Sequence, residues 1–201
     1  MAGNKLLPGY SLSVPNPAAG GKKRPLPEGL RKDLETLKSF GPAAERAAAA
    51  AAFSDSAKKG ADISEAYPSL VDTLQDPEVE MRRYAANAIF SSLAKSPCQP
   101  ELVLPISKAA EDFDPDVRSL CVRSLGRLAR VGNDIDTAMR AIIKAMSDPD
   151  PNVKLSACRA AREASARAEV DISPAMDILI ELIDDPSPGV RAEAIEAVGS
   201  R

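Results

Sequence analysis

The sequence predicts an all-α protein in which about five helical hairpins stack into an α-solenoid behind an extended N-terminal arm. Three observations lead to this prediction. Apolar residues follow a helical period through residues 27–201, a segment that opens with Asp or Ser recurs every 36 or 37 residues, and no segment shows the alternation typical of strands. A recurring unit of this length is typical of stacked helical repeats, because one hairpin alone cannot bury its apolar face.

The repeat is visible as four segments that align with one another without gaps. They are DPEVEMRRYAANAIF from Asp76, DFDPDVRSLCVRSLG from Asp112, DPDPNVKLSACRAAR from Asp148 and DPSPGVRAEAIEAVG from Asp185. A step of 37 residues back from Asp76 reaches a degenerate fifth copy, SFGPAAERAAAAAAF, at Ser39. Five copies in one register indicate that the whole of residues 27–201 is a repeat array.

Each aligned segment is expected to form the second helix of a hairpin. One column is apolar in every copy: Ala44, Met81, Val117, Val153 and Val190. Small and then apolar residues follow four and eight positions later, which defines one face of a helix. Another helical pattern precedes each segment, and prolines such as Pro77 and Pro151 lie between the two helices, where proline ends one helix and opens the next. The expected repeats are 27–58, 59–96, 97–132, 133–169 and 170–201.

These residues resemble HEAT repeats, including the HEAT-like repeats of phycobilin lyases. Residues 185–194 follow the D-P-x-P-x-V-R-x-x-A pattern of the family's second helix, and residues 148–157 match it with Lys154 in the Arg place. Prolines in the first helices resemble those that kink the first helix of HEAT units: Pro68, Pro105 and Pro174. The period is slightly shorter than the usual HEAT period of about 40–47 residues. The resemblance implies a scaffold or adaptor, because HEAT arrays serve mainly in that role.

Two polar columns run through the repeats. One is acidic, with Asp76, Asp112, Asp148 and Asp185, and the other is basic and lies six residues later, with Arg82, Arg118, Lys154 and Arg191. The resemblance implies a structural ladder of hydrogen bonds between neighbouring turns, and an Asp before a helix also caps its free N–H groups. The first copy has Ser39 and Glu45 in these columns, as expected of an end repeat that lacks one neighbour.

The N-terminal arm, residues 1–26, is rich in Pro and Gly and has no acidic residue. Its net charge of +4 leaves −7 for residues 27–201. Pro and Gly at this density prevent a continuous helix. One interpretation is a disordered leader. The other is a partner-binding arm that orders on binding through four apolar anchors, Leu6, Leu7, Tyr10 and Leu12. Deletion of the arm without loss of any interaction would contradict the second interpretation.

Arginines recur on the second helices of repeats two to four, at Arg83, Arg123, Arg127, Arg159 and Arg162. The first helices carry acidic residues instead. The resemblance implies that the second helices line the concave side, so these arginines would form a basic inner ridge. Because the planar guanidinium fits carboxylate and phosphate, we interpret the ridge as an interface for acidic groups of a partner. The alternative interpretation is a charged face that is merely solvated.

Composition argues against most catalytic chemistry. The chain has no His, which excludes imidazole acid–base catalysis, and its three dispersed Cys lack the spacing of a zinc site. Dispersed cysteines in odd number favour a reducing intracellular compartment. No apolar run is long enough for a membrane span. The negative body and the absence of Trp argue against nucleic-acid binding. We therefore predict no catalytic residue, cofactor or metal.

The function predicted from these features is that of a non-catalytic protein–protein interaction scaffold or adaptor. It would be a structural subunit of a larger assembly that binds other protein subunits through its ridge and its arm. The alternative that the resemblance suggests is a phycobilin-lyase-like subunit or a chaperone for pigment attachment. The last repeat keeps the internal apolar pattern at Val190, Ala194, Ile195 and Val198. Either a neighbouring protein covers the end of this last repeat or the natural chain continues.

Overall fold

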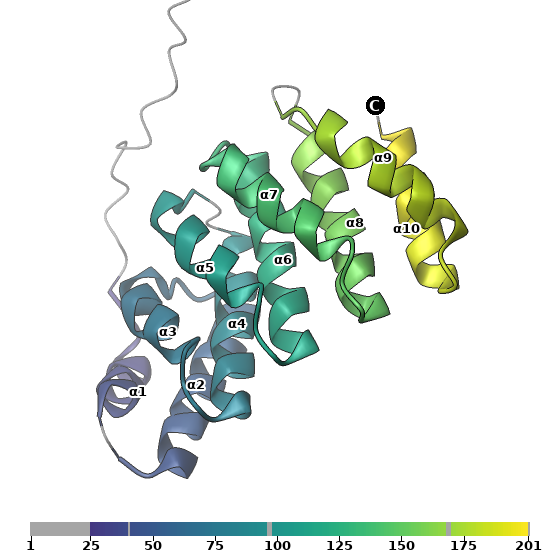
Figure 1. The fold of residues 1–201 in the computed structure, drawn as a ribbon. Coiled ribbons are helices and arrows are strands. Elements are labelled where there is room, and N and C mark those ends of the chain that lie inside the picture. Colours follow the sequence, from purple (N-terminus) through teal and green to yellow (C-terminus); the bar gives the residue numbers. More distant parts are fainter. Residues whose placement is uncertain (1–24, 40, 96–97, 168–169, 201) are drawn as a thin grey trace, which may run out of the picture.

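The computed structural model describes residues 25–39, 41–95, 98–167 and 170–200, and Figure 1 shows their arrangement. Over these residues the chain forms ten α-helices and three short 3-10 helices, with no strand among them. The prediction of an all-α solenoid is confirmed.

The ten helices form five successive pairs. The first members of the pairs are α1 (Glu28–Lys38), α3 (Tyr67–Thr73), α5 (Val103–Ala109), α7 (Ile135–Ala145) and α9 (Ser173–Glu181). The second members are α2 (Ala43–Lys58), α4 (Val79–Leu93), α6 (Pro115–Arg130), α8 (Pro151–Ser165) and α10 (Pro188–Gly199). We call the two sets the A layer and the B layer. Neighbouring helices pack more extensively within the B layer than within the A layer, which places the B layer on the inner side of the array.

Local sequence explains where the helices begin. Asp114 and Asp150 precede α6 and α8, and each side-chain carboxylate accepts two backbone N–H groups of the first turn. Proline occupies the first position of both helices, where its missing N–H costs nothing. In the A layer, 3-10 turns at Ser64–Ala66 and Pro100–Leu102 lead directly into α3 and α5.

The core lies between the two layers, and the predicted apolar column forms its centre. Met81, Val117, Val153 and Val190 are at most 1% exposed. The small column behind them is buried as well, including Cys121. Close packing of short side chains brings the B helices near one another, so arginines on neighbouring B helices can meet.

The first repeat lies one residue away from its predicted register, and this prediction is wrong. Ala44 and Ala48 were expected in buried columns but are exposed, whereas Phe53 is completely buried. Residues 47–52 are six successive alanines, so the apolar pattern looks the same whichever face of α2 is buried. The alanines alone therefore cannot determine how α2 is rotated about its axis. The bulky Phe53 sets it, because only one rotation of the helix hides that ring from water.

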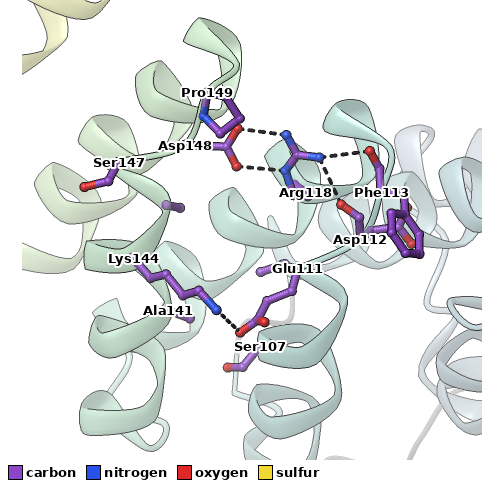
Figure 2. Close-up of a pocket in the computed structure, with 12 residues that line it drawn as sticks. Ser107, Glu111, Asp112, Phe113, Arg118, Ala141, Lys144, Ser147, Asp148 and Pro149 are labelled. Carbon is purple, nitrogen blue, oxygen red and sulfur yellow. Dashed lines mark hydrogen bonds and ion pairs between the residues drawn. The ribbon is translucent and has the colours of Figure 1, made fainter.

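A ladder of ion pairs joins the turns of neighbouring repeats, and Figure 2 shows one rung. Arg118 donates two hydrogen bonds of 2.8 Å, from Nε and Nη2, to the carboxylate of Asp148 in the next repeat. Its Nη1 donates to the carbonyls of Asp112 and Phe113 in its own turn, at 2.9 and 3.0 Å. The guanidinium of Arg118 thus ties two successive turns together, and that of Arg82 does the same.

The other rungs pair Arg46 with Asp76, Arg82 with Asp112, and Lys154 with Asp185. The structural ladder that the resemblance implied is therefore present. The corrected register puts Arg46, not Glu45, in the basic column, 30 residues before its partner as in the next two rungs. The first repeat consequently supplies the basic side chain of the first rung.

Ion pairs between neighbouring repeats, within the ladder and beside it, are expected to make the fold sensitive to acid. The hydrogen bond from Lys154 lowers the pKa of Asp185, and that from Arg83 lowers the pKa of Asp114. A carboxyl group with a lowered pKa in the folded state stabilises the fold above its unfolded pKa of about 3.9 and loses this contribution as the pH falls through the folded value. We expect urea unfolding to show a stability that falls below about pH 4. Asp185→Asn should flatten this fall, and an equally steep fall in the variant would contradict the assignment.

Candidate protein-interaction surface

Three of the five predicted ridge arginines border one hollow on the B layer. Arg123 on α6 and Arg159 and Arg162 on α8 line it together with Arg130, and its volume is about 500 Å³. The lining contains one carboxylate, that of Glu163. We call this site the basic hollow, because its lining residues include four arginines and one acidic residue.

Helix geometry brings these side chains together. Arg123 and Arg130 are seven residues apart on α6, and Arg159 and Arg162 are three apart on α8, so each pair shares one helix face. Gly126 lets the two helices approach closely, since a Cβ atom there would lie 2.7 Å from the Cα atom of Ala160. The close crossing turns two separate pairs of arginines into one cluster.

Charge repulsion marks the inner part of the hollow. Burial, followed by the positive charge of Arg159, lowers the pKa of Arg123. The Arg123 guanidinium carbon lies 4.2 Å from the centre of the Phe90 ring, which provides a cation–π contact. An anion placed in the hollow would lower the energy of these like charges.

Acidic side chains neutralise the hollow only in part. Nε of Arg159 donates to Oε1 of Glu193 at 2.6 Å, while Arg162 lies 3.6 Å from Glu193 and 3.6 Å from Glu196. Arg130 lies 3.8 Å from Glu163. The side chains of Arg130, Arg159 and Arg162 remain 41–46% exposed, so they can still reach an external carboxylate.

The other two ridge arginines lie outside the lining of the hollow. Arg83 holds the Asp114 carboxylate with two hydrogen bonds, at 3.0 and 2.6 Å. Arg127 donates to the backbone carbonyl of Phe90 and stacks over its ring, 3.7 Å from the centre. These contacts connect α4 to the following repeat. A partner-binding role for all five arginines stays a prediction.

The arm anchors Leu6, Leu7, Tyr10 and Leu12 lie outside the described residues. The described chain begins at Pro25, and the N–H of Leu26 donates to Oε2 of Glu65 at 3.4 Å. Pro25 and Pro27 border a hollow of about 380 Å³ at the start of the solenoid.

Sequence reasoning missed one apolar feature of the surface. Phe113, in the turn between α5 and α6, is fully exposed and borders two hollows of about 560 Å³ each. Figure 2 shows the hollow between this turn and the next one, with Phe113 at its edge. Proline fills the same place in the other three turns, at Pro77, Pro149 and Pro186. The sequence signal that could have indicated this exposed side chain is the phenylalanine at a turn position that is proline in the other three repeats.

We expect Phe113→Ala to leave the urea midpoint of unfolding unchanged, because the side chain buries no surface and Arg118 contacts only the backbone carbonyl. Far-UV circular dichroism during a urea titration measures this. A lowered midpoint would show that the ring packs against the fold after all.

The described residues contain no group of three or more side chains suited to hold a metal ion, and none of the described helices has both the length and the apolar character needed to cross a membrane. Cys121 and Cys158 are buried, whereas Cys98 is exposed. Burial, the largest influence, raises the pKa of Cys158 to about 12, so this thiol stays protonated at neutral pH.

Comparisons with known proteins agree with this architecture. A family model described as HEAT repeats matches residues 139–201. No curated protein sequence matches the chain.

Similar solved structures include a computationally designed armadillo repeat protein for modular peptide recognition, at 22% identity and a TM-score of 0.65 over 85% of this chain and 81% of that one. Another designed armadillo repeat protein, in complex with the peptide (KR)4, has 17% identity and a TM-score of 0.65, again over 85% and 81%. The complex of CpcE and CpcF of phycocyanin lyase from Nostoc sp. PCC7120 has 18% identity and a TM-score of 0.61, over 85% of this chain and 98% of that one. The chain thus has the fold of armadillo- and HEAT-type helical-repeat solenoids, and its residues 139–201 match the HEAT-repeat model.

Proposed function

We propose that this protein is a non-catalytic interaction scaffold, an adaptor or structural subunit of a larger assembly, that binds an acidic segment of a partner protein in the basic hollow. One observation carries the proposal: four arginines line a hollow whose lining has a single acidic residue. The repeat-solenoid fold, which is typical of interaction scaffolds, supports it.

The chemistry of arginine makes carboxylates the preferred ligands. A guanidinium presents paired N–H donors that match the two oxygens of a carboxylate, and charge-assisted hydrogen bonds of this kind are stronger than neutral ones. A bound Asp or Glu would also offset the repulsion between Arg123 and Arg159. Complementary charge would in addition speed association.

The designed neighbour that was solved with the basic peptide (KR)4 offers a useful contrast. The basic hollow has the opposite requirement, since a second positive chain would meet four arginines. We therefore infer that this protein prefers acidic over basic peptides, which gives the proposal a direct test.

The test uses fluorescein-labelled octaglutamate and (KR)4 as probes of the full chain in fluorescence anisotropy. Arg123→Gln with Arg130→Gln removes two charges from the hollow and leaves the Arg159–Glu193 hydrogen bond in place. Arg159 is not changed, because a Glu at this position would place a second carboxylate next to Glu193. We expect the double variant to lose about tenfold or more in octaglutamate affinity, because each removed guanidinium takes away charge-assisted hydrogen bonds.

The matched control is Arg31→Gln with Arg140→Gln, which removes the same charge from exposed positions on α1 and α7. This control should keep the octaglutamate affinity within about twofold, since charges far from the site are screened by salt. Equal losses in both double variants, or tighter binding of (KR)4 than of octaglutamate, would contradict the proposal.

The pigment-attachment alternative makes a different prediction. A lyase-like subunit or pigment chaperone would give bilin-dependent absorbance after co-expression, whereas the proposed scaffold would not. We further propose that the N-terminal arm makes a second contact with the partner, because the arm carries apolar anchors. We also propose a reducing intracellular compartment as the site of action, because the cysteines are unpaired.

A further inference from the structure

The outer face of the last helix, α10, repeats the surface that α6 presents to the next repeat. The two helices align at a distance of 73 residues, or two repeats. The correspondences are Arg118 with Arg191, Ser119 with Ala192, Val122 with Ile195, and Gly126 with Gly199. We call the four residues on α10 the C-terminal face.

On α6 these four positions hold the hairpin α7–α8 in place. Arg118 pairs with Asp148, the hydroxyl of Ser119 lies 2.8 Å from that of Ser156, Val122 is fully buried, and Gly126 lies against Ala160. One repeat therefore packs on the next through four features: a charged rung, a small polar contact, an apolar centre and a glycine at the helix crossing.

On α10 the apolar centre of this surface is open. The corresponding residue is at most 2% exposed in each of the first four repeats: Ala50, Ala86, Val122 and Cys158. Ile195, in contrast, is 56% exposed. No neighbouring atom lies within 4 Å of the place that a Cβ atom on Gly199 would take, whereas the same place on Gly126 is filled by the next helix.

The charged rung on α10 is open as well. Arg191 donates to the carbonyls of Asp185 and Pro186 in its own turn, at 2.9 and 3.1 Å, in the same way that Arg118 does. Among the described residues no carboxylate forms an ion pair with Arg191, although the other ladder residues each have one. The guanidinium is already oriented by its own turn, and its other N–H groups can donate to a carboxylate.

We propose that the C-terminal face binds a helical hairpin of a partner protein, whose turn supplies an Asp to Arg191 and whose second helix lies across Ile195 and Gly199. The hairpin α7–α8 provides the template for this partner. From Asp148 its small contact residues follow after 8 and 12 positions, at Ser156 and Ala160. The partner helix should therefore carry small residues at about these spacings after its Asp, so that it can approach Gly199 closely.

Charge distinguishes this partner from a second copy of the chain. The first repeat of a second copy would present the exposed Ala44 and Ala48 of α2, which offer a smooth surface to Ile195. Its ladder position holds Phe40, however, where the other repeats have Asp. A second copy would leave Arg191 without a carboxylate, so a different protein with an Asp-bearing turn fits better.

The test places the photocrosslinker p-benzoylphenylalanine at position 195 of the full chain, in a lysate of the source cells, and maps the crosslinked residue by mass spectrometry. Position 104 on α5 is the matched control, because Leu104 is apolar and 58% exposed but lies in the A layer. We expect a crosslink at position 195 into a helix that follows an Asp-bearing turn. Arg191→Glu should lower its yield about tenfold, and replacing the mapped Asp by Arg should restore it.

A second variant guards against an effect on folding. Ala192→Arg places bulk on the exposed C-terminal face without touching Arg191, and it should abolish the crosslink while circular dichroism stays unchanged. The proposal is overturned by a yield at position 195 no higher than at 104, by a crosslink between two copies of this chain, by a partner segment without such an Asp, or by a yield that Arg191→Glu leaves intact.

Discussion

Replacing Arg118 by alanine is expected to lower the free energy of unfolding by about 3–5 kcal/mol, as found when one partner of a buried ion pair is removed. The Arg118 and Asp148 side chains are only 14% and 11% exposed. Burial alone would raise the pKa of Asp148, yet the hydrogen bond from Arg118 helps to hold it below its ordinary value. Without Arg118, the buried Asp148 carboxylate keeps the N–H of Asp150 but loses its cationic partner, and two carbonyl groups lose the guanidinium N–H. Urea unfolding monitored by circular dichroism measures the loss.

The control for this prediction lies beside the same turn. Lys144 and Glu111 form an ion pair of 2.7 Å, visible in Figure 2, but their side chains are 67% and 59% exposed. Lys144→Ala should therefore cost less than about 1 kcal/mol. Similar losses for Lys144→Ala and Arg118→Ala would show that the ladder is no more important to stability than a surface pair.

Gly126→Val is expected to destabilise the protein by about 3 kcal/mol or more, the upper range for overpacking a closely packed site. A Cβ atom on Gly126 would lie 2.7 Å from the Cα atom and 2.9 Å from the carbonyl oxygen of Ala160. Both are backbone atoms of α8, which cannot move aside as a flexible side chain would. The helices α6 and α8 would have to separate, and thermal unfolding would show this as a lower midpoint.

Alanine substitution gives a sharper comparison, because alanine favours helix over glycine by about 1 kcal/mol. Gly126→Ala should nevertheless destabilise, since the contact with Ala160 outweighs this gain. Gly29 in α1 has no atom within 4 Å of its would-be Cβ, so Gly29→Ala should be neutral or stabilising. If Gly126→Ala stabilised as much as Gly29→Ala, the close crossing of α6 and α8 would be disproved.

The architecture could be predicted because different apolar residues return at one spacing. Met81, Val117 and Val153 are all apolar and hold the same place in successive repeats, and a common buried position explains their recurrence. The same logic failed in the first repeat. A run of alanines does not show which face of the helix is buried. The residues that do show it, Arg46 and Phe53, each appear only once in α2.

The site was harder to predict, because it depends on distances between repeats. The sequence showed a set of arginines but not that Glu193 would pair with Arg159 or that Arg83 would hold Asp114. Such pairs depend on how closely neighbouring helices approach one another, a distance that contacts like the one between Gly126 on α6 and Ala160 on α8 determine. Phe113 was overlooked for a different reason: a single exposed aromatic residue leaves no periodic pattern.

The lysine in the fourth rung gives the array an uneven stiffness. The ammonium group of Lys154 contacts Asp185, but it makes none of the hydrogen bonds by which Arg82 and Arg118 grip their own turns. Among the described residues the last hairpin has a neighbour on one side only, and its rung lacks the hydrogen bonds to the preceding turn that Arg82 and Arg118 make. We therefore expect α9 and α10 to open as one unit at a lower free energy than an interior hairpin, which amide hydrogen exchange would show as weaker protection of these two helices.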